Sequence, residues 1–509
     1  MSRVACGIVC ACVTMWPAPM RAQPADLRQR VEAYVSANQR AIVAELVELL
    51  SIPNAGGDGD GIAKNAEFLR RMLEGRGFGA EVLQTTGNPL VFGDLRVPGA
   101  TRTLLIYSHY DGQPVNPADW KQPSPFSPLL RDGRMEDGGR EVPGLGGLDR
   151  FEPDWRLYAR SASDDKSPIV ALCAALDALT ASGLKPTSNL KVILDGEEEA
   201  GSPSLVPAIG RYRSKFSADA MLILDGPVHP SGKPTLVFGA RGIVTFTLKV
   251  YGPKFALHSG HYGNWVPNPA TRLAQLLATF KDDDGRVLVD GFYAGIDPLR
   301  PEEQQMLDAV PDDPAQLKAL FGISVPENSQ RTLQESLQVP SFNIRGLSSA
   351  FVGEGARTII PDSAEAEIDV RLVKETPALA MLEKIRAHIR KQGYHVVSTD
   401  PDDATRARYA KIVKMTTSES GTNAYRTSPL LPVSQQLSGA LQQVFGEPPV
   451  RIRTSGGTVP IAPFIDALGF PAISVPIVNF DNNQHGENEN LRLGHFFRGI
   501  AIIAGALQM

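Results

Sequence analysis

At residues 190–202 the chain reads LKVILDGEEEAGS, and its organisation follows from this stretch. Residues 190–194 form a short apolar run with β-branched members, which predicts a buried strand that stops at an aspartate, a glycine and three glutamates. Three adjacent carboxylates raise one another's pKa unless a cation lies among them. Taken alone, the stretch predicts either a metal site or a solvated acidic turn.

Two further apolar runs end in polar residues of the same kind. Residues 103–108 lead into His109-Tyr110-Asp111, and residues 220–224 lead into Asp225-Gly226-Pro227. Open α/β sheets bind ligands beyond the carboxyl ends of their strands. The three runs therefore predict one shared site, although they lie far apart in the sequence.

The composition is that of a globular protein with room for at least two domains. Of the 509 residues, 42% are hydrophobic and 21% are charged. The formal net charge is −5, and no long cluster of Lys and Arg occurs. Nucleic acid and anionic membrane surfaces are therefore not expected as partners.

The first residues have the pattern of a secretory signal. Arg3 precedes an uncharged apolar run over residues 4–16, and polar sequence follows Gln23. The run is too short to span a bilayer, so it predicts a signal peptide over residues 1–22 and a secreted or periplasmic protein with no membrane span in the mature chain. Cys173 would be the single cysteine left, which excludes an intrachain disulfide.

The rest of the chain divides by its periodicity. Helices are expected over residues 26–52 and 61–77, before the strands of the central sheet. From Thr235 the pattern of the sequence changes, and residues 237–250 read as a pair of strands. This change predicts an inserted α+β domain over residues 237–415, between two parts of a catalytic domain, 23–236 and 416–509. Residues 298–340 are partly helical by pattern, and their role is left open.

An apolar helix is expected from Ile169 to about Ser182, preceded by Asp164 and Asp165 and by a proline at its start. Aspartate is a frequent helix cap, so capping this helix is an alternative to a role in the site for one of the two aspartates. Residues 113–155, rich in Pro and Gly, predict loops with a short hairpin.

Six motifs stand in an order that resembles a known family. They are SHYDGQP at 108–114, SDDKSP at 163–168, EEEAGS at 197–202, LD at 224–225, LHSG at 257–260, and His485 followed by ENE at 487–489. The order resembles the dizinc metallopeptidases that include carnosinase-type dipeptidases, glutamate carboxypeptidases, aminoacylases and succinyl-diaminopimelate desuccinylases, and it is closest to the first of these. The resemblance implies an α/β catalytic domain with a mixed central sheet flanked by helices, and an inserted lid or dimerisation domain.

The resemblance also implies two zinc ions per subunit. Asp164 would bridge them, with His109 and Asp225 completing one site, and Glu199 and His485 the other. Imidazole nitrogen and carboxylate oxygen suit Zn²⁺, and Mn²⁺ or Co²⁺ are alternatives. Asp111 lies two residues beyond His109, so on a strand it would face the same way, and the family gives it the role of holding that imidazole.

Glu198 is the predicted base. Two zinc ions lower the pKa of a bridging water, and the resulting hydroxide would attack the amide while Glu198 handles the proton. The resemblance gives His258 an oxyanion-stabilising role in the partner subunit's site, which requires a homodimer formed through the inserted domain. The alternative for His258 is an ordinary surface histidine.

Substrate-binding residues follow from two further segments. The resemblance assigns Thr358 and Arg371 to the substrate, and Arg371 would clamp a terminal carboxylate; a surface salt bridge is the alternative. Gly457 and Thr458 belong to a glycine-rich turn that would meet the same carboxylate.

The predicted function is an exported zinc metallopeptidase that hydrolyses dipeptides or the C-terminal residues of short peptides. An N-acyl amino acid amidohydrolase is the alternative, because hydroxide attack on an amide does not distinguish the two acyl groups. A metal-free binding protein on the same fold is a further alternative, which the costly clustering of carboxylates disfavours.

Overall fold

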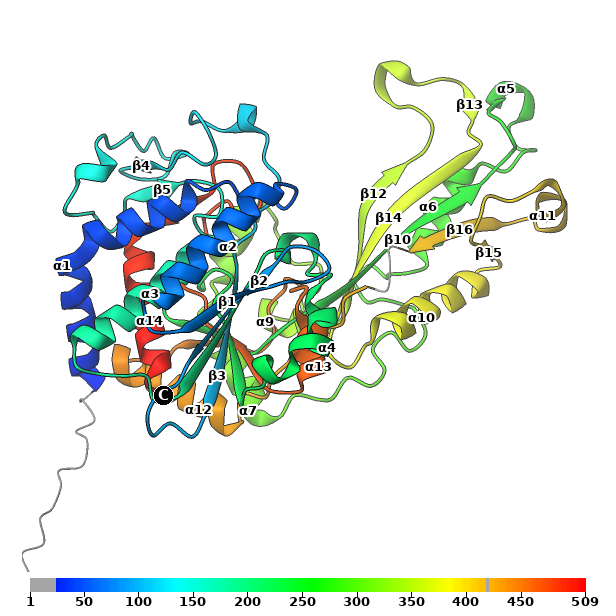
Figure 1. The fold of residues 1–509 in the computed structure, drawn as a ribbon. Helices are drawn as coiled ribbons and strands as arrows, with labels where there is room; N and C mark the ends of the chain where they lie inside the picture. The colour runs from blue at the N-terminus through cyan, green and yellow to red at the C-terminus, as the bar shows by residue number, and fades with distance from the viewer. Residues whose placement is uncertain (1–23, 418–420) are drawn as a thin grey trace, which may run out of the picture.

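The computed structural model describes residues 24–417 and 421–509, so the predicted signal peptide lies outside the described residues. The chain forms a body built on an eight-stranded sheet and an arm built on a five-stranded sheet. In Figure 1 the arm, coloured green to yellow, projects from one side of the body.

The body sheet contains the strand that the glutamates follow. Its spatial order is β1 (Gly79–Leu83), β2 (Leu90–Leu95), β6 (Asn189–Asp195), β3 (Thr103–His109), β7 (Ala220–Ile223), β19 (Ala472–Ser474), β8 (Thr235–Val237) and β18 (Val450–Ile452). The four strands β6, β3, β7 and β19 are mutually parallel, and β2 is antiparallel to β6. All seven residues of β6 are buried, which fits the apolar side chains of Leu190 and of residues 192–194.

Helices cover both faces of this sheet. Alternate residues of β3 enter different apolar clusters: Leu104 and Ile106 pack in one, Leu105 and Tyr107 in the other. The first cluster is completed by α1 (Pro24–Leu50), α2 (Gly59–Glu74), α3 (Lys166–Ala181), α12 (Pro432–Phe445) and α14 (Leu493–Leu507). The second is completed by α4 (Leu205–Phe216) and α13 (Ala462–Leu468). The predicted α/β class with a mixed central sheet is confirmed.

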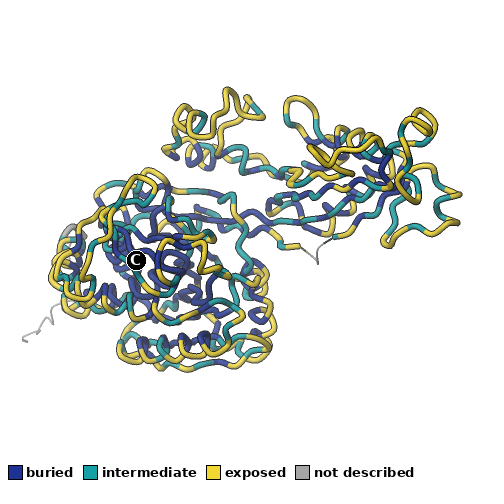
Figure 2. Tube along the Cα trace, turned by 90° about the horizontal axis from the view of Figure 1, so that it is seen from above, coloured by how far each residue is buried: buried dark blue, intermediate teal, exposed yellow. Residues whose placement is uncertain are grey.

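The arm sheet has one covered face. Its order is β12 (Ser341–Ser348), β14 (Ser363–Leu372), β10 (Gly242–Tyr251), β16 (Ile412–Thr417) and β15 (His395–Val397). Helices α6 (Pro269–Ala278) and α10 (Ala378–Lys391) pack on the apolar face, and burial alternates along β10 as expected for such a sheet. Figure 2 shows buried residues along the arm and many exposed ones towards its tip.

Shorter elements complete the chain. Three small sheets consist of β4 (Leu129–Arg131), β5 (Arg156–Tyr158) and β20 (Asn490–Arg492), of β9 (Gly239–Ala240) and β17 (Tyr425–Arg426), and of β11 (Leu257–His258) and β13 (Ile359–Ile360). The short helices are α5 (Ser259–Tyr262), α7 (Pro301–Asp308), α8 (Pro314–Phe321), α9 (Leu333–Ser336) and α11 (Asp403–Arg408). Turns of 3-10 helix lie at Pro117–Asp119, Leu145–Gly147, Glu198–Ala200 and Gly353–Gly355. Among the described residues, no helix has both the length and the apolar character that crossing a membrane requires.

Candidate active site

The site lies where the parallel strands of the body sheet end. His109 closes β3 and pairs in register with Asp195, the last residue of β6. Asp225 follows β7 by two residues, and Tyr107 of β3 pairs with Ile223 at the end of that strand. The carboxyl ends of parallel strands thus bring residues from three distant segments to one edge of the sheet.

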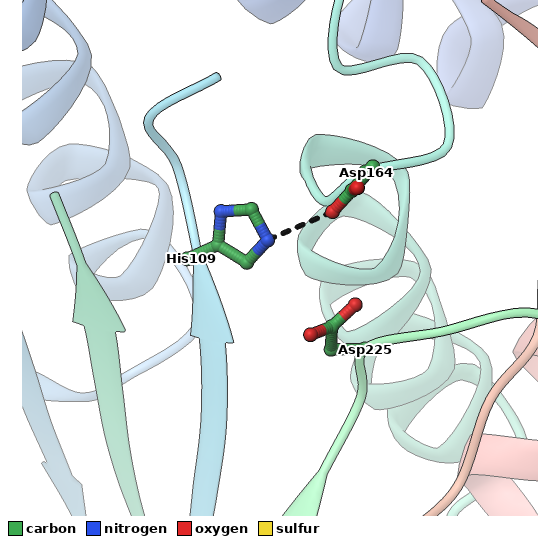
Figure 3. Close-up of side chains that lie close together, drawn as sticks. All are labelled: His109, Asp164 and Asp225. Carbon is green, nitrogen blue, oxygen red and sulfur yellow. Dashed lines mark hydrogen bonds and ion pairs between the residues drawn. The ribbon is translucent and has the colours of Figure 1, made fainter. Parts of the chain in front are cut away.

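The first ligand group consists of His109, Asp164 and Asp225. Each offers one nitrogen or oxygen atom within 4.8 Å of the others, and Figure 3 shows the three side chains facing one another. His109 Nε2 lies 2.9 Å from Asp164 Oδ1. His109 and Asp164 are buried, so the group lies inside the protein at the sheet edge.

The second group consists of Asp164, Glu199 and His485. His485 Nε2 lies 3.1 Å from Asp164 Oδ2 and 3.5 Å from Glu199 Oε2. The side chain of His485 is 56% exposed, which leaves this group open on one side. Asp164 contributes one carboxylate oxygen to each group, so two cations bound here would share it.

The electrostatics of the cluster fit cations. Burial, followed by the charge of Asp164, raises the pKa of Glu199 to about 7 and that of Asp225 to about 6. Burial also opposes ionisation of Asp164, yet the hydrogen bonds from His109 and His485 hold its pKa below the ordinary value. Imidazole nitrogens and carboxylate oxygens in this arrangement are the donors that zinc takes.

Asp111 connects both parts of the cluster. Its carboxylate oxygen Oδ1 lies 3.3 Å from His109 Nδ1, the ring nitrogen that points away from Asp164. The same carboxylate accepts the backbone N–H groups of Glu198 at 3.1 Å and Glu199 at 3.0 Å. Asp111 therefore fixes the imidazole and the glutamate turn together.

Glu198 belongs to neither ligand group but lies beside both. Its Oε2 atom is 3.9 Å from His109 Nε2, and its side chain is 12% exposed. Burial raises its pKa well above the usual range, the charges of Asp225 and Asp164 add to this, and His109 opposes it. A carboxyl group placed beside the ligand groups, with its affinity for a proton raised in this way, suits a proton-transfer role.

One cavity of about 640 Å³ joins these residues to the predicted substrate-binding residues Arg371, Gly457 and Thr458. A guanidinium N–H of Arg371 donates to Thr458 Oγ1 at 2.8 Å. The alternative partner of Arg371, Asp369, lies 4.0 Å away, at the limit of an ion pair. Arg371 therefore faces the cavity and holds the glycine-rich turn.

His258 and Thr358 lie elsewhere. Both are exposed, and they are neighbours, because the N–H of Ser259 donates to the Thr358 carbonyl at 3.0 Å. The elements around them, β13 and α5, stand at the tip of the arm in Figure 1, away from the body sheet. Neither residue lines the cavity of its own chain.

Asp165 does not cap the helix that follows it. It occupies the N-cap position of α3, but its side chain makes no capping hydrogen bond. Its carboxylate instead accepts a hydrogen bond from the Ser108 hydroxyl and one from the His109 N–H at 3.3 Å. The helix-cap alternative is wrong because the side chain turns into the buried end of β3.

Two glutamines at the site have no role predicted from the sequence. Gln113 donates to Glu199 Oε2 at 2.6 Å, and Gln484 donates to Asp164 Oδ2 at 3.3 Å. Gln113 lies inside the first quoted motif and Gln484 directly precedes His485. Proximity in sequence to expected ligands is the signal that points to them.

The model of peptidase family M20/M25/M40 matches residues 142–509, which is more than half of the chain. The chain belongs to this peptidase family. It is thus a metallopeptidase, a hydrolase of peptide amide bonds, and two zinc ions are the cofactors that the family and the two ligand groups indicate.

Relatives of this peptidase are similar over nearly its full length. The Cys-Gly metallodipeptidase of Candida albicans is 26% identical, covering 91% of this chain and 93% of the relative. The human Beta-Ala-His dipeptidase is 24% identical, and the match covers 94% of this chain and 92% of the relative. The crystal structure of a metallo-carboxypeptidase from Sulfolobus solfataricus matches with a TM-score of 0.72 and 29% identity, covering 92% of this chain and 98% of that one.

The comparisons contradict the prediction of a secreted or periplasmic enzyme. The yeast Cys-Gly metallodipeptidases that the peptidase resembles are cytosolic enzymes. The prediction rested on residues 1–22 alone, and these lie outside the described residues.

Proposed function

We propose that this metallopeptidase cleaves dipeptides, or the C-terminal residue of short peptides. The observation that carries the proposal is that one cavity is lined by four of the five proposed ligands, Asp164, Glu199, Asp225 and His485, together with Glu198 and the Arg371–Thr458 pair. Arg371 suits a free carboxylate close to the scissile amide, which is a feature of dipeptides. Relatives named as Cys-Gly and Beta-Ala-His dipeptidases support the same substrate class.

In this proposal His109, Asp164 and Asp225 would hold one zinc ion, and Asp164, Glu199 and His485 would hold the second. The bound ions supply an acidified water and a polarised carbonyl. Glu198 accepts the proton of the attacking water and returns it to the leaving amine. Asp111 keeps His109 in the tautomer and orientation that a ligand needs.

Arg371, Gly457 and Thr458 bind the substrate carboxylate. The hydrogen bond to Thr458 orients the guanidinium before the substrate arrives, so less conformational freedom is lost on binding. Backbone N–H groups of the glycine-rich turn at Gly457 and Thr458 add donors that favour an anion.

We further propose that the active enzyme is a homodimer formed through the arm. His258 and Thr358 would then enter the partner's cavity together, since they are neighbours at the arm tip. Strand β12 is an edge strand whose Ile344 and Leu347 are 43% and 63% exposed. An unpaired apolar edge of this kind suits a second copy.

The test is product analysis by mass spectrometry on a panel of dipeptides, tripeptides and N-acyl amino acids, with zinc-loaded and metal-free protein. Zinc-dependent release of amino acids from free dipeptides supports the proposal. Release from N-acyl amino acids alone would replace it by a deacylase. Inactivity on the whole panel with two zinc ions bound would reject both.

A further inference from the structure

The motif after His485 contains a buried carboxylate that the proposed chemistry does not use. Glu489 is fully buried. Its Oε1 atom accepts the N–H groups of Ser163 at 2.9 Å and Asp164 at 3.0 Å, and its Oε2 atom accepts that of Ser161 at 3.0 Å. Both oxygens of Glu489 therefore hold the loop that presents the shared ligand Asp164.

Arg160 connects Glu489 to the loop of another ligand. One guanidinium N–H donates to Glu489 Oε2 at 2.8 Å, and a second donates to the carbonyl of Gly486 at 3.0 Å. Gly486 directly follows His485. Arg160 is 2% exposed, and its guanidinium carbon lies 5.3 Å from the ring centroid of Trp120, which restricts it further.

The backbone places the two loops side by side. Strands β5 and β20 are antiparallel, with Tyr158 opposite Asn490. The loop after β5 carries Asp164, and the loop before β20 carries His485, so both leave the same end of the strand pair. The N–H of Ala159 donates to the Glu489 carbonyl at 3.2 Å and extends the pairing by one residue.

We infer that Glu489 and Arg160 are positioning residues that set the separation of Asp164 and His485, and hence the retention of the metal ions. This rests on the proposed function, in which those two residues are ligands. Neither Glu489 nor Arg160 lies among the cavity-lining residues, so their effect reaches the metal through the two loops. Groups that orient metal ligands change metal affinity by about 10- to 100-fold when they are replaced.

The experiment compares zinc release from the holoenzyme in wild type, Glu489→Gln and Glu303→Gln, using a chromogenic chelator in excess. Glu303 is the control, because its side chain is 8% exposed and forms an ion pair with Arg453 at 3.0 Å. It is therefore a buried glutamate–arginine pair like Glu489 and Arg160, but neither of its members contacts a loop that carries a proposed metal ligand. We expect Glu489→Gln to release zinc at least about 10-fold faster than wild type, and Glu303→Gln to release it at the wild-type rate.

Arg160→Lys provides a second variant should Glu489→Gln fail to fold, because it keeps the positive charge and loses the fork that reaches both Glu489 and Gly486. Thermal melting of the metal-free proteins separates folding from metal retention. Equal release rates in wild type and the folded variant would overturn the inference. Fewer than two zinc ions in the wild type would instead reject the proposed function, so the two failures are distinguishable.

Discussion

Glu198 belongs to neither ligand group and its side chain lines the cavity, which makes its replacement informative. Glu198→Gln keeps the shape of the side chain and removes its ability to take up a proton. We expect kcat to fall by about 100-fold or more, the range for loss of a general base. Zinc content, measured by atomic absorption, should stay at the wild-type level. Loss of zinc in the variant would mean that Glu198 is a ligand, and near-normal kcat would mean that another group handles the proton.

His495 supplies a pH dependence that is separate from the metal ligands. Burial, followed by the charges of Arg492 and Arg498, lowers its pKa from the ordinary 6.5 to about 4. Between pH 4 and 6.5 the unfolded chain binds this proton and the folded chain does not, so the folded state loses stability as the pH falls through this range. Across this whole pH range, the titration of His495 lowers the free energy of unfolding by about 3 kcal/mol.

We therefore expect the melting midpoint of His495→Gln to fall less steeply with decreasing pH than that of the wild type. Thermal melting midpoints of the wild type should drop more between pH 6.5 and pH 4.5 than those of the variant, which carries no titrating group at this position. The comparison is made on metal-free protein, so that zinc loss in acid does not contribute. Parallel midpoints in the two proteins would show that His495 titrates alike in the folded and unfolded states.

The segment 298–340 supports the glycine-rich turn through Gln338. Gln338 lies just after α9 and is buried. Its side-chain oxygen accepts hydrogen bonds from Arg453 at 2.7 Å and from the Thr454 hydroxyl at 3.2 Å, and its amide donates to the Gln334 carbonyl at 3.0 Å. Arg453 and Thr454 lead directly into the turn that contains Gly457 and Thr458.

Gln338→Leu removes the two bonds to this turn. We expect KM for dipeptides to rise by about 10-fold with kcat little changed, since each bond is worth about 1 kcal/mol and the turn binds substrate without entering the proton transfer. Gln316→Leu is the control, an exposed glutamine on α8 of the same segment. An unchanged KM in Gln338→Leu would assign the segment a structural role alone.

Elements with continuous or alternating apolar patterns were predictable from the sequence, and contacts between distant loops were not. Strand β6 followed from its apolar run, and the proposed ligands followed from motifs at strand ends. Strand β16 was not predicted, because Lys414 interrupts its short apolar run and its parallel partner β15 is joined to it through α11. The Arg160–Glu489 pair spans over three hundred residues, and no local pattern encodes such a contact.

The arm separates His258 from the cavity of its own chain. Besides Ile344 and Leu347 of β12, the arm carries exposed aromatic side chains near its tip: Phe255 is 67% exposed and Trp265 is 81% exposed. An interface through this surface would cover them and deliver His258 to a second cavity. The dimer prediction is first checked by sedimentation, where a fully active monomer would contradict it.

Mixing two inactive variants tests whether the partner's His258 serves the site. Subunits with His258→Ala keep Glu198, and subunits with Glu198→Gln keep His258, so a hybrid dimer has one site with both groups. After dissociation and random reassociation, half of the dimers are hybrids and each has one complete site, which gives about a quarter of wild-type activity. Recovery of that activity requires His258 to act across the interface. If the mixture stays as inactive as its components while wild type treated in the same way regains activity, His258 serves only its own chain or none.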